Sequence, residues 1–340
     1  MTHAQPTATP QRTLRTLRMQ LNTFYSGPQA WFFLADERGY LQDEGLALEF
    51  TEGDTAANTI PKMAAGGFDV GYGDLNALIE HLAAGKPNAP LAVFAAYNAS
   101  PYTIAVAKDG TIRSPAQLAG KRLVAHPNDA ALNLFAEFCA RTGLDPGSVN
   151  ITLSSAPHSE LVPALLAGQW DGLFGFVNTL VAAALDAGLA APREPLRFIE
   201  YHDHVPELYG MAILATRELA ATDPDLVRAL LRALNRGLQD TVADPEAAID
   251  ALVKRNPAMN RASNLRRLQG TLALEMGRPE GAVLGIGDLD DARFARGIDL
   301  IVNTRKFAIR PQPAALFCRA FLPPLSSRVR SLATASPRRP

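Results

Sequence analysis

The chain has 340 residues, of which 47% are hydrophobic and 20% charged, with a formal net charge of -1. This length suits two domains better than one core. The balanced charge argues against a nucleic-acid partner, and no apolar run approaches the roughly 20 residues of a membrane-spanning helix.

The N-terminal residues 1–14 are expected to be flexible and to lack an export signal. Residues 1–11 are polar, whereas a secretory signal needs a continuous apolar stretch of about 7–15 residues. Either a signal has been removed or the protein is not exported by that route. The two cysteines, Cys139 and Cys318, are too few for a disulfide framework or a zinc ribbon. Cys139 falls on the apolar face of a predicted helix and is expected to be a buried free thiol.

Strands and helices are predicted to alternate along both halves of the chain. Residues 15–22 and 46–51 are predicted strands of the first half, and residues 121–126 and 149–153 are their counterparts in the second. Cap-type residues follow the second strand of each half, and helical spacing follows the caps. The helical residues are Ala56, Ala57, Ile60, Met63 and Ala64 in one half and Leu134, Phe135, Phe138 and Cys139 in the other.

An internal repeat supports this division. Residues 66–78 resemble residues 168–180, with Gly, an aromatic residue, Asp, Gly, Asn and Leu recurring in register. Each copy predicts a helix that ends at a glycine, a short buried strand, and a new helix. Asp69 and Asp171 precede their strands and are interpreted as turn formers. The repeat predicts two similar α/β lobes with mostly parallel sheets and a ligand cleft between them.

The chain is expected to cross between the lobes near residues 100–102 and 202–209. One lobe then comprises residues 15–101 and 205–325, and the other comprises residues 102–204. Residues 326–340 are rich in Ser, Arg and Pro and are expected to form a disordered tail.

Ligands of open parallel sheets bind beyond the carboxyl ends of the strands. The loops at those ends supply the candidate ligand-binding residues, which are Asn22, Phe24, Tyr25, Asp54, Thr55, Asp74, Tyr102, Asn128, Asp129, His158, Phe176 and Asn178. The aromatic members offer stacking faces. Asp54 and Asp129 have a competing interpretation as helix N-caps without a ligand role.

Residues 39–49, Gly-Tyr-Leu-Gln-Asp-Glu-Gly-Leu-Ala-Leu-Glu, resemble the "GYFxxEGLxVE" signature of a known family. It comprises the sulfonate, nitrate, taurine and thiamine-pyrimidine substrate-binding proteins of ABC transporters, the SsuA/THI5-like or NMT1 family. Residues 66–78, 112–123, 164–178 and 225–257 resemble the same family in the same order.

The resemblance implies a type II periplasmic-binding fold that closes around a small organic solute by hinge motion. It also implies an ABC permease and ATPase as partners, a periplasmic location and a monomer. Leu226, Leu230, Leu231 and Leu234 are then expected on the apolar face of a helix that packs on the first lobe.

The chain departs from the family at the helix start after the first strand of the second lobe. Members that bind oxyanions commonly place glycine and small hydroxyl residues there, whereas this chain has Asn128 and Asp129. With Asp54 and Asp74, three carboxylates at one mouth disfavour sulfonate or nitrate. They favour a neutral or amine-bearing ligand, such as a thiamine-pyrimidine-like heterocycle, and an anionic solute remains the alternative.

An enzyme of the same fold is the main competing function. The eukaryotic thiamine-pyrimidine synthase resembles this family and forms a pyrimidine from histidine and pyridoxal phosphate. Lys62 and His81 lie in the first lobe, but the cysteine-rich run of that enzyme has no counterpart here. The sequence therefore predicts a binding protein and not an enzyme, with no cofactor.

The sequence predicts no metal site and no ligand-binding role for Arg266 and Arg267. His202 and His204 form the only close histidine pair, and no third ligand is identified, so no metal site is predicted. Arg266 and Arg267 are expected on a solvated face.

Overall fold

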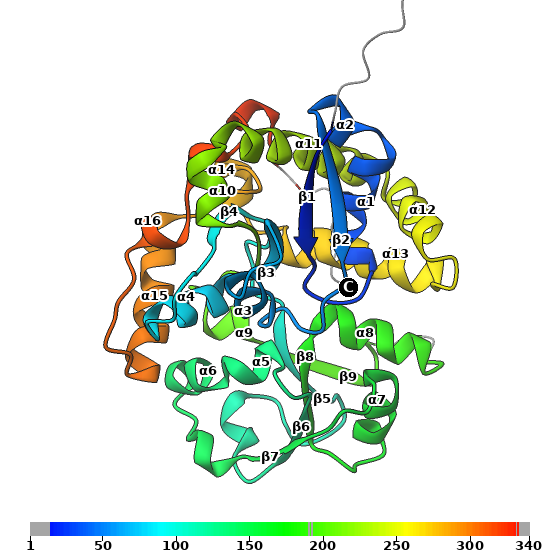
Figure 1. The fold of residues 1–340 in the computed structure, drawn as a ribbon. Coiled ribbons are helices and arrows are strands. Elements are labelled where there is room, and N and C mark those ends of the chain that lie inside the picture. The colour runs from blue at the N-terminus through cyan, green and yellow to red at the C-terminus, as the bar shows by residue number, and fades with distance from the viewer. Residues whose placement is uncertain (1–13, 190, 192, 331, 333–340) are drawn as a thin grey trace, which may run out of the picture.

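The computed structural model describes residues 14–189, 191, 193–330 and 332. The chain forms two lobes, one above the other in Figure 1, each built around a five-stranded sheet. In spatial order, the sheet of the first lobe contains β2 (Leu46–Thr51), β1 (Arg15–Gln20), β3 (Val70–Asp74), β10 (Met211–Ala215) and β4 (Leu91–Ala95). The sheet of the second lobe contains β7 (Asn150–Leu153), β6 (Arg122–Ala125), β8 (Gly172–Phe176), β5 (Tyr102–Ala107) and β9 (Leu196–Glu200).

The two sheets have the same topology. In each, two neighbouring pairs are parallel, and the other two pairs are antiparallel. The prediction of two similar α/β lobes with mostly parallel sheets is confirmed. Each sheet is mixed, with four strands running in one direction and one strand, β10 or β5, running against them. The reason is that β10 and β5 each enter their sheet from the other lobe, and therefore run against the strands that begin within it.

Helices cover both sheets. Those of the first lobe and the C-terminal part are α1 (Ala30–Glu37), α2 (Tyr40–Asp43), α3 (Thr59–Ala64), α4 (Leu75–Ala83), α10 (Arg217–Thr222), α11 (Pro224–Ala243), α12 (Pro245–Arg255), α13 (Arg261–Gly270), α14 (Glu280–Leu284), α15 (Asp291–Arg305) and α16 (Pro313–Leu316). Those of the second lobe are α5 (Ala130–Asn133), α6 (Phe135–Thr142), α7 (His158–Leu166), α8 (Val177–Asp186) and α9 (Tyr201–His204). Among the described residues, none of these helices is long and apolar enough to cross a membrane.

The repeat seen in the sequence forms equivalent structure in both lobes. Gly66 and Gly168 end their helices with φ of 87° and 77°, values that favour glycine. The carboxylate of Asp69 accepts hydrogen bonds from the backbone and side chain of Arg18 on β1. Asp171 binds Arg122 on β6 in the same way. Each aspartate therefore connects the residue before one strand to the neighbouring parallel strand.

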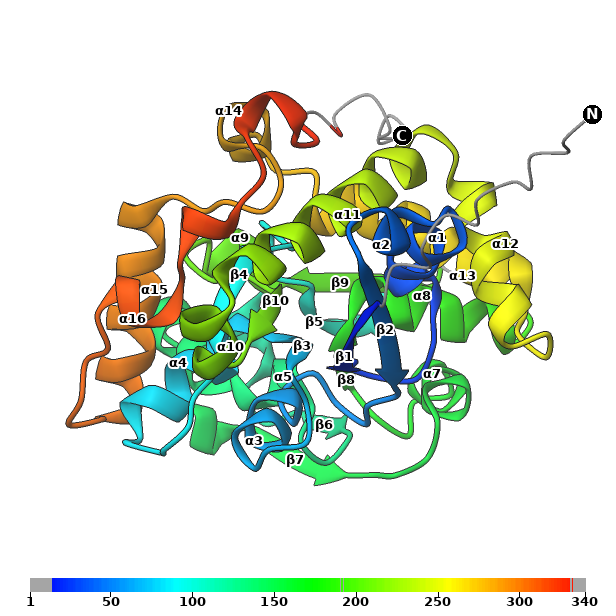
Figure 2. The same cartoon turned by 45° about the horizontal axis from the view of Figure 1, so that its top comes forward.

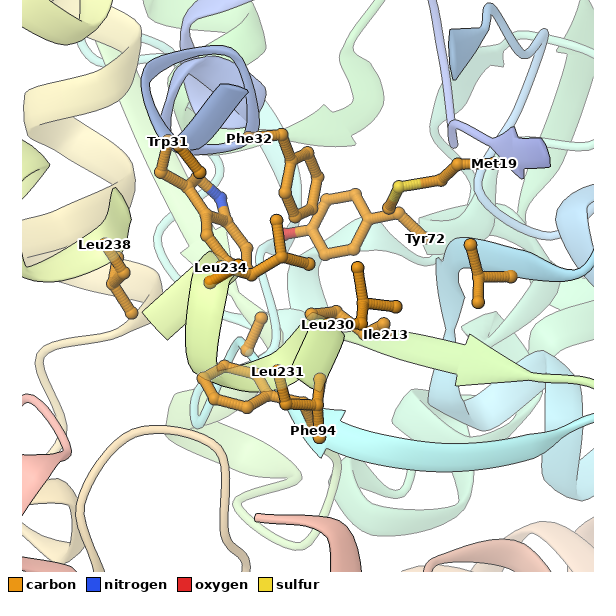
Figure 3. Packing of buried hydrophobic residues seen from close by; sticks show 14 of the residues in the cluster. Met19, Trp31, Phe32, Tyr72, Phe94, Ile213, Leu230, Leu231, Leu234 and Leu238 are labelled. Atoms are coloured by element: carbon orange, nitrogen blue, oxygen red, sulfur yellow. The ribbon is translucent and has the colours of Figure 1, made fainter. Parts of the chain in front are cut away.

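The core of the first lobe lies between its sheet and α1, α11 and α12. Leu230, Leu231 and Leu234 of α11 are buried, and Figure 3 shows them facing Phe94 and the side chains around it. Leu226 packs at the margin of the same core. The apolar stripe expected on this helix is thus confirmed, and its burial anchors the C-terminal part of the chain to the first lobe.

Two segments, residues 96–101 and 205–210, carry the chain between the sheets. Arg293 of α15, which is buried, donates to the carbonyls of Asn98, Pro206 and Leu208 at 2.8, 2.6 and 2.8 Å. One guanidinium therefore holds both crossing segments, and its charge is balanced by Glu280 at 2.8 Å.

The C-terminal segment departs from the expected disorder at its start. Val329 and Leu332 are buried in the core of the first lobe, and the backbone of Ile286 donates to the Val329 carbonyl. These apolar contacts keep the chain packed beyond residue 325. Residues 331 and 333–340, like residues 1–13, lie outside the described residues.

Candidate ligand-binding site

Asp74 and Tyr102 join the two lobes at the base of the gap between them. Asp74 is buried at the start of α4, where it accepts from the backbone N–H groups of Asn76 and Ala77 at 2.7 and 3.2 Å. The hydroxyl of Tyr102, on β5 of the second lobe, donates to the same carboxylate. Burial raises the pKa of both groups. Phe176 packs edge-on against the Tyr102 ring at 5.5 Å.

Asn178 and Glu275 make a second contact between the lobes. Asn178 lies in the first turn of α8, and its Nδ2 donates to Oε1 of Glu275 at 2.9 Å. Glu275 ends a π-helical turn, Thr271–Glu275, of a kind that is frequent at functional sites. Burial raises the pKa of Glu275 to about 7. The preceding residue, Gly270, leaves no room for a side chain, because a Cβ there would lie 2.1 Å from Oδ1 of Asn178.

The buried hydroxyl groups of Tyr72, Tyr97 and Thr271 lie near this contact and interact with one another and with Glu275 through their side chains. The Tyr97 ring lies edge-on to Tyr72 at 6.1 Å, and burial raises the pKa of both tyrosines, so both stay protonated. The buried hydroxyl of Ser100 has no hydrogen-bond partner. Buried polar groups are normally satisfied, so this hydroxyl indicates a place for water or a ligand. In Figure 3, Tyr72 lies beside Phe32 with its oxygen on the side of Trp31.

His158, the first residue of α7, stacks on His126 with ring centroids 4.1 Å apart. His126 Nε2 lies 2.7 Å from the Ala156 carbonyl, whereas His158 Nε2 is buried without a partner. Burial lowers the pKa of His158 to about 3, and the charges of His126 and Arg267 act in the same direction. His158 is therefore neutral at physiological pH.

The guanidinium of Arg267, on α13, lies near groups of both lobes. Its charge interacts with Glu275 and Tyr97, and it lowers the pKa of His158. The expectation of a solvated face is wrong for this residue, which is half-buried with its Nε enclosed and unpartnered. Its neighbour Arg266 is exposed as expected. We call Tyr72, Tyr97, Asn178, Arg267, Thr271 and Glu275 the interlobe polar cluster.

A third contact lies on the opposite side, where α15 meets both α4 and α6 (Figure 1). Arg305 Nε donates to Glu137 of the second lobe at 2.8 Å, and its Nη2 to Glu80 of the first at 3.3 Å. Burial raises the pKa of Glu80 to about 7, and Arg305 opposes this rise.

A small hollow, with a cavity volume of about 30 Å³, lies next to this contact. It is lined from the first lobe by Ala57, Asp74, Ala77 and Glu80 and from the second by Ala130, Asn133 and Leu134. Organic ligands usually occupy about 300–1,000 Å³. A ligand of that size would therefore need the lobes to move apart here.

The other predicted site residues make contacts within their own lobe. Asn22 accepts from Gln29 Nε2 at 2.5 Å, and the Tyr25 ring packs on Phe33 at 4.9 Å. The Thr55 hydroxyl accepts a hydrogen bond from the Asn58 backbone at 3.4 Å. Phe24 and Asn128 are exposed, and Asn128 has a left-handed φ of 59°.

The carboxylates of Asp54, Asp74 and Asp129 do not share a partner. Asp54 is exposed and pairs with Lys62 at 3.0 Å, and Asp74 binds Tyr102. Asp129 caps α5 by accepting from Ala131 and Leu132 at 2.7 and 3.3 Å. Because each carboxylate is occupied locally, the argument that three free carboxylates select an amine-bearing ligand loses its structural basis.

Sequence reasoning missed most of the interlobe polar cluster. Tyr72 lies in the strand of the first repeat copy, and Tyr97 follows β4. From the sequence alone, tyrosines at both positions are expected to pack in the core. Arg267, Thr271 and Glu275 come from C-terminal helices far along the chain, and only the return of α13 onto α8 brings them to the gap. The π-helical turn that orients Glu275 has no signature in the sequence.

Comparison with known proteins identifies the family. The family described as NMT1/THI5 like matches residues 29–248 of this chain. The chain belongs to the NMT1/THI5-like family. This confirms the relationship expected from residues 39–49 and the segments that follow them.

One solved structure similar to this NMT1/THI5-like chain is the alkanesulfonate-binding protein SsuA from Xanthomonas axonopodis pv. citri bound to MOPS. It superposes with a TM-score of 0.66 at 20% identity, over 92% of this chain and 99% of that one. This likeness confirms the periplasmic-binding fold.

Curated relatives correct another expectation. The chain is 23% identical over 265 residues to a 4-amino-5-hydroxymethyl-2-methylpyrimidine phosphate synthase of Aspergillus parasiticus, covering 74% of this chain and 75% of the relative. It is 24% identical over 222 residues to a Schizosaccharomyces pombe protein of the same name, covering 63% and 62%. The prediction that the chain is not an enzyme is contradicted, since both relatives are named as enzymes.

Proposed function

We propose that this chain captures a small organic solute between its two lobes and presents it to the permease and ATPase of an ABC importer. The observation that carries the proposal is that Ser100 Oγ and Arg267 Nε of the first lobe are buried without a hydrogen-bond partner, while the charge of Arg267 acts on His158 of the second lobe. Such atoms are costly to bury unless something binds them.

The way the two lobes are connected also supports capture of a solute by closure of the lobes. Two segments link the lobes, an apolar cluster continues from one lobe into the other, and side chains such as Asn178 and Arg305 make polar contacts between them. A ligand that binds both lobes favours the closed state over the open one. Residues 15–101 with 205–325 act as one body in this proposal, and residues 102–204 as the other. A periplasmic location and a monomeric state go with it.

The test is ligand-dependent compaction. Small organic solutes are screened by thermal unfolding, and small-angle X-ray scattering then measures the radius of gyration with each stabilising solute. At a concentration of about 100 times Kd, a ligand of the native state stabilises it by about 2.7 kcal/mol. Compaction together with stabilisation supports the proposal, and stabilisation with an unchanged radius contradicts hinge closure.

Gly270→Val provides the matched variant, because its side chain would collide with Asn178 and hold α13 away from α8. We expect this variant to fold but to lose ligand-induced compaction. Gln269→Val, at an exposed position one residue earlier, is the control and should close like the wild type. Equal compaction of Gly270→Val would show that α13 and α8 do not meet in the closed state.

The second candidate function is synthesis of the pyrimidine phosphate, favoured by the names of the two curated relatives. The residues weighed for such chemistry lie outside the interlobe polar cluster. Lys62, on α3, forms an ion pair with Asp54, and His81 Nε2 lies 2.9 Å from the Pro87 carbonyl. A visible absorbance band of a lysine-bound pyridoxal in the purified protein, lost in Lys62→Met, would favour the synthase.

A further inference from the structure

A cavity of about 300 Å³ lies on the second lobe and has no part in the function proposed above. Its lining residues are Lys108, Arg193, Leu196, Arg197, Phe198 and Glu200. Four of them belong to β9, which forms one edge of its sheet, and consecutive residues of a strand point to opposite faces. The cavity therefore follows the outer edge of β9. Its volume is at the lower end of the range, about 300–1,000 Å³, that organic ligands occupy.

Two cations of this cavity lie far from the gap between the lobes. β5 begins at Tyr102, at the contact with the first lobe, and Lys108 lies six residues further along the chain. At about 3.4 Å per residue, this is a distance of about 20 Å. The Lys108 backbone donates to the Pro195 carbonyl at 2.8 Å, directly before β9, and Arg197 pairs with Val106. Lys108 and Arg197 are therefore at the far end of the sheet, away from the interlobe polar cluster.

Positive charges in the lining exceed negative charges by two, because Lys108, Arg193 and Arg197 are cations and Glu200 is the single carboxylate. Among the residues that the structure describes, none of the three cations takes part in an ion pair, whereas Glu200 lies 3.4 Å from Nδ1 of His202. Nε of Arg197 is buried without a hydrogen-bond partner. A buried donor without an acceptor is costly, so this nitrogen indicates a place for an oxygen of a ligand.

The other lining residues supply an apolar wall beside these charges. Leu196 is buried in the core of the second lobe, and Phe198 packs half-buried against that core. The guanidinium of Arg193 lies over the Phe198 ring, 5.4 Å from its centroid, and this cation–π contact positions the exposed arginine at the cavity. The adjacent acids Asp109 and Glu194 are exposed and do not line the cavity. The cavity therefore combines positive charge with an apolar surface.

We propose that this cavity binds a small organic anion with two negative charges, a phosphate monoester or a dicarboxylate, at a second site outside the gap between the lobes. The guanidinium of Arg197 offers donors that match two oxygens of such an acid group. Lys108, two residues beyond the Val106 that pairs with Arg197, adds a second charge, and the carbon part of the ligand contacts Phe198. A phosphate monoester carries a charge of about −1.5 to −2 at pH 7, which offsets the excess charge of the lining.

The experiment compares aromatic acids that differ in charge. The probes are phenyl phosphate and isophthalate, which are dianions, and benzenesulfonate, which is a monoanion. Titration calorimetry measures Kd, and the backbone amide signals of residues 196–200 in ¹⁵N NMR spectra report where each probe binds. We expect at least one dianion to shift these signals and to bind about tenfold more tightly than benzenesulfonate, or better, since one hydrogen bond to a charged group is worth a factor of about 10 or more. Which dianion binds distinguishes the phosphate monoester from the dicarboxylate.

Variants then locate the site. Arg197→Gln should raise Kd of the active dianion by about 10- to 100-fold, the range expected for hydrogen bonds to a charged group. Lys108→Gln, at an exposed position, should raise it by about two- to fivefold. Arg296→Gln and Lys86→Gln remove the same charges at exposed positions outside the second lobe, and as matched controls they should change Kd by less than about twofold.

Three outcomes would overturn the inference. One is equal binding of the dianions and benzenesulfonate, another is binding of the active dianion by Arg197→Gln as tightly as by the wild type, and the third is a set of NMR shifts confined to residues at the gap, such as 176–178. If Arg197→Gln does not fold, the wild-type shifts of residues 196–200 still decide. Because the site uses no residue of the interlobe polar cluster, its failure would leave solute capture between the lobes untouched.

Discussion

At the scale of single residues, two carboxyl groups at the contacts between the lobes, those of Glu275 and Glu80, are affected by their burial. Glu275 is buried with a hydrogen bond from Asn178, and Glu80 shares Arg305 with Glu137. The burial of each carboxyl group disfavours its charged form and moves its pKa to about 7. Small changes of pH near neutrality therefore change the charge of the surfaces that meet when the lobes close.

Glu275→Gln should change how stability depends on pH. The folded protein holds the Glu275 proton up to about pH 7, whereas an unfolded glutamate releases it near pH 4.5. Between these values the folded state binds more protons, so this residue lowers stability as pH rises. The glutamine keeps the acceptor for Asn178 and removes the titration. We expect a gain of about 3 kcal/mol over the wild type at pH 8 compared with pH 4.5.

Urea unfolding of both proteins at several pH values measures this difference. Glu246→Gln, at an exposed position on α12, is the control and should alter the profile by less than about 0.5 kcal/mol. Parallel profiles for Glu275→Gln and the wild type would mean that Glu275 is ionised in the folded protein at neutral pH.

At the scale of elements, the packing of α11 against α1 fixes where the C-terminal helices begin. Gly237 lies in the middle of α11, where a glycine normally weakens a helix. Here it allows close approach, because a Cβ would lie 2.6 Å from Cβ of Ala35 and 2.6 Å from the Trp31 carbonyl. The glycine therefore lowers the intrinsic stability of α11 but allows it to pack closely against α1.

Gly237→Ala tests this contact. On an exposed helix the change would stabilise by about 1 kcal/mol, but here we expect it to destabilise by about 1–3 kcal/mol, because the backbones of α1 and α11 must separate. Thermal or urea unfolding measures the difference. A stabilised variant would show that the two helices are not packed this closely.

At the scale of the whole molecule, Arg293 connects the two segments that join the lobes. Arg293 binds carbonyl groups from both crossing segments and lies over the Tyr209 ring at 3.9 Å. Figure 2 shows α15, the helix that carries it, running along the side of the molecule. The apolar cluster that includes Phe294 continues from the first lobe into the second, so apolar packing joins the lobes as well as Arg293.

Arg293→Lys should loosen this hinge. A lysine keeps the charge but cannot donate in the fixed directions of a guanidinium, so at least one of the three carbonyls loses its donor. We expect a loss of about 2–3 kcal/mol in stability, with faster amide hydrogen exchange in residues 96–101 and 205–210. Arg296→Lys, exposed on the same helix, is the control. Unchanged exchange in both segments would mean that the hinge is held by apolar packing alone.

The sequence by itself determined the repeated architecture, since glycine placement, buried strands and cap residues are local signals, and both copies use them at Gly66 and Gly168. It also gave the family and the apolar face of α11. It could not decide that Asp54, Asp74 and Asp129 are each occupied by a different partner, because those partners are set by side-chain packing. Only the tertiary structure brings Arg267, Glu275 and His158 together. His158 lies more than a hundred residues before the other two in the chain, and the burial of all three exists only when both lobes are folded.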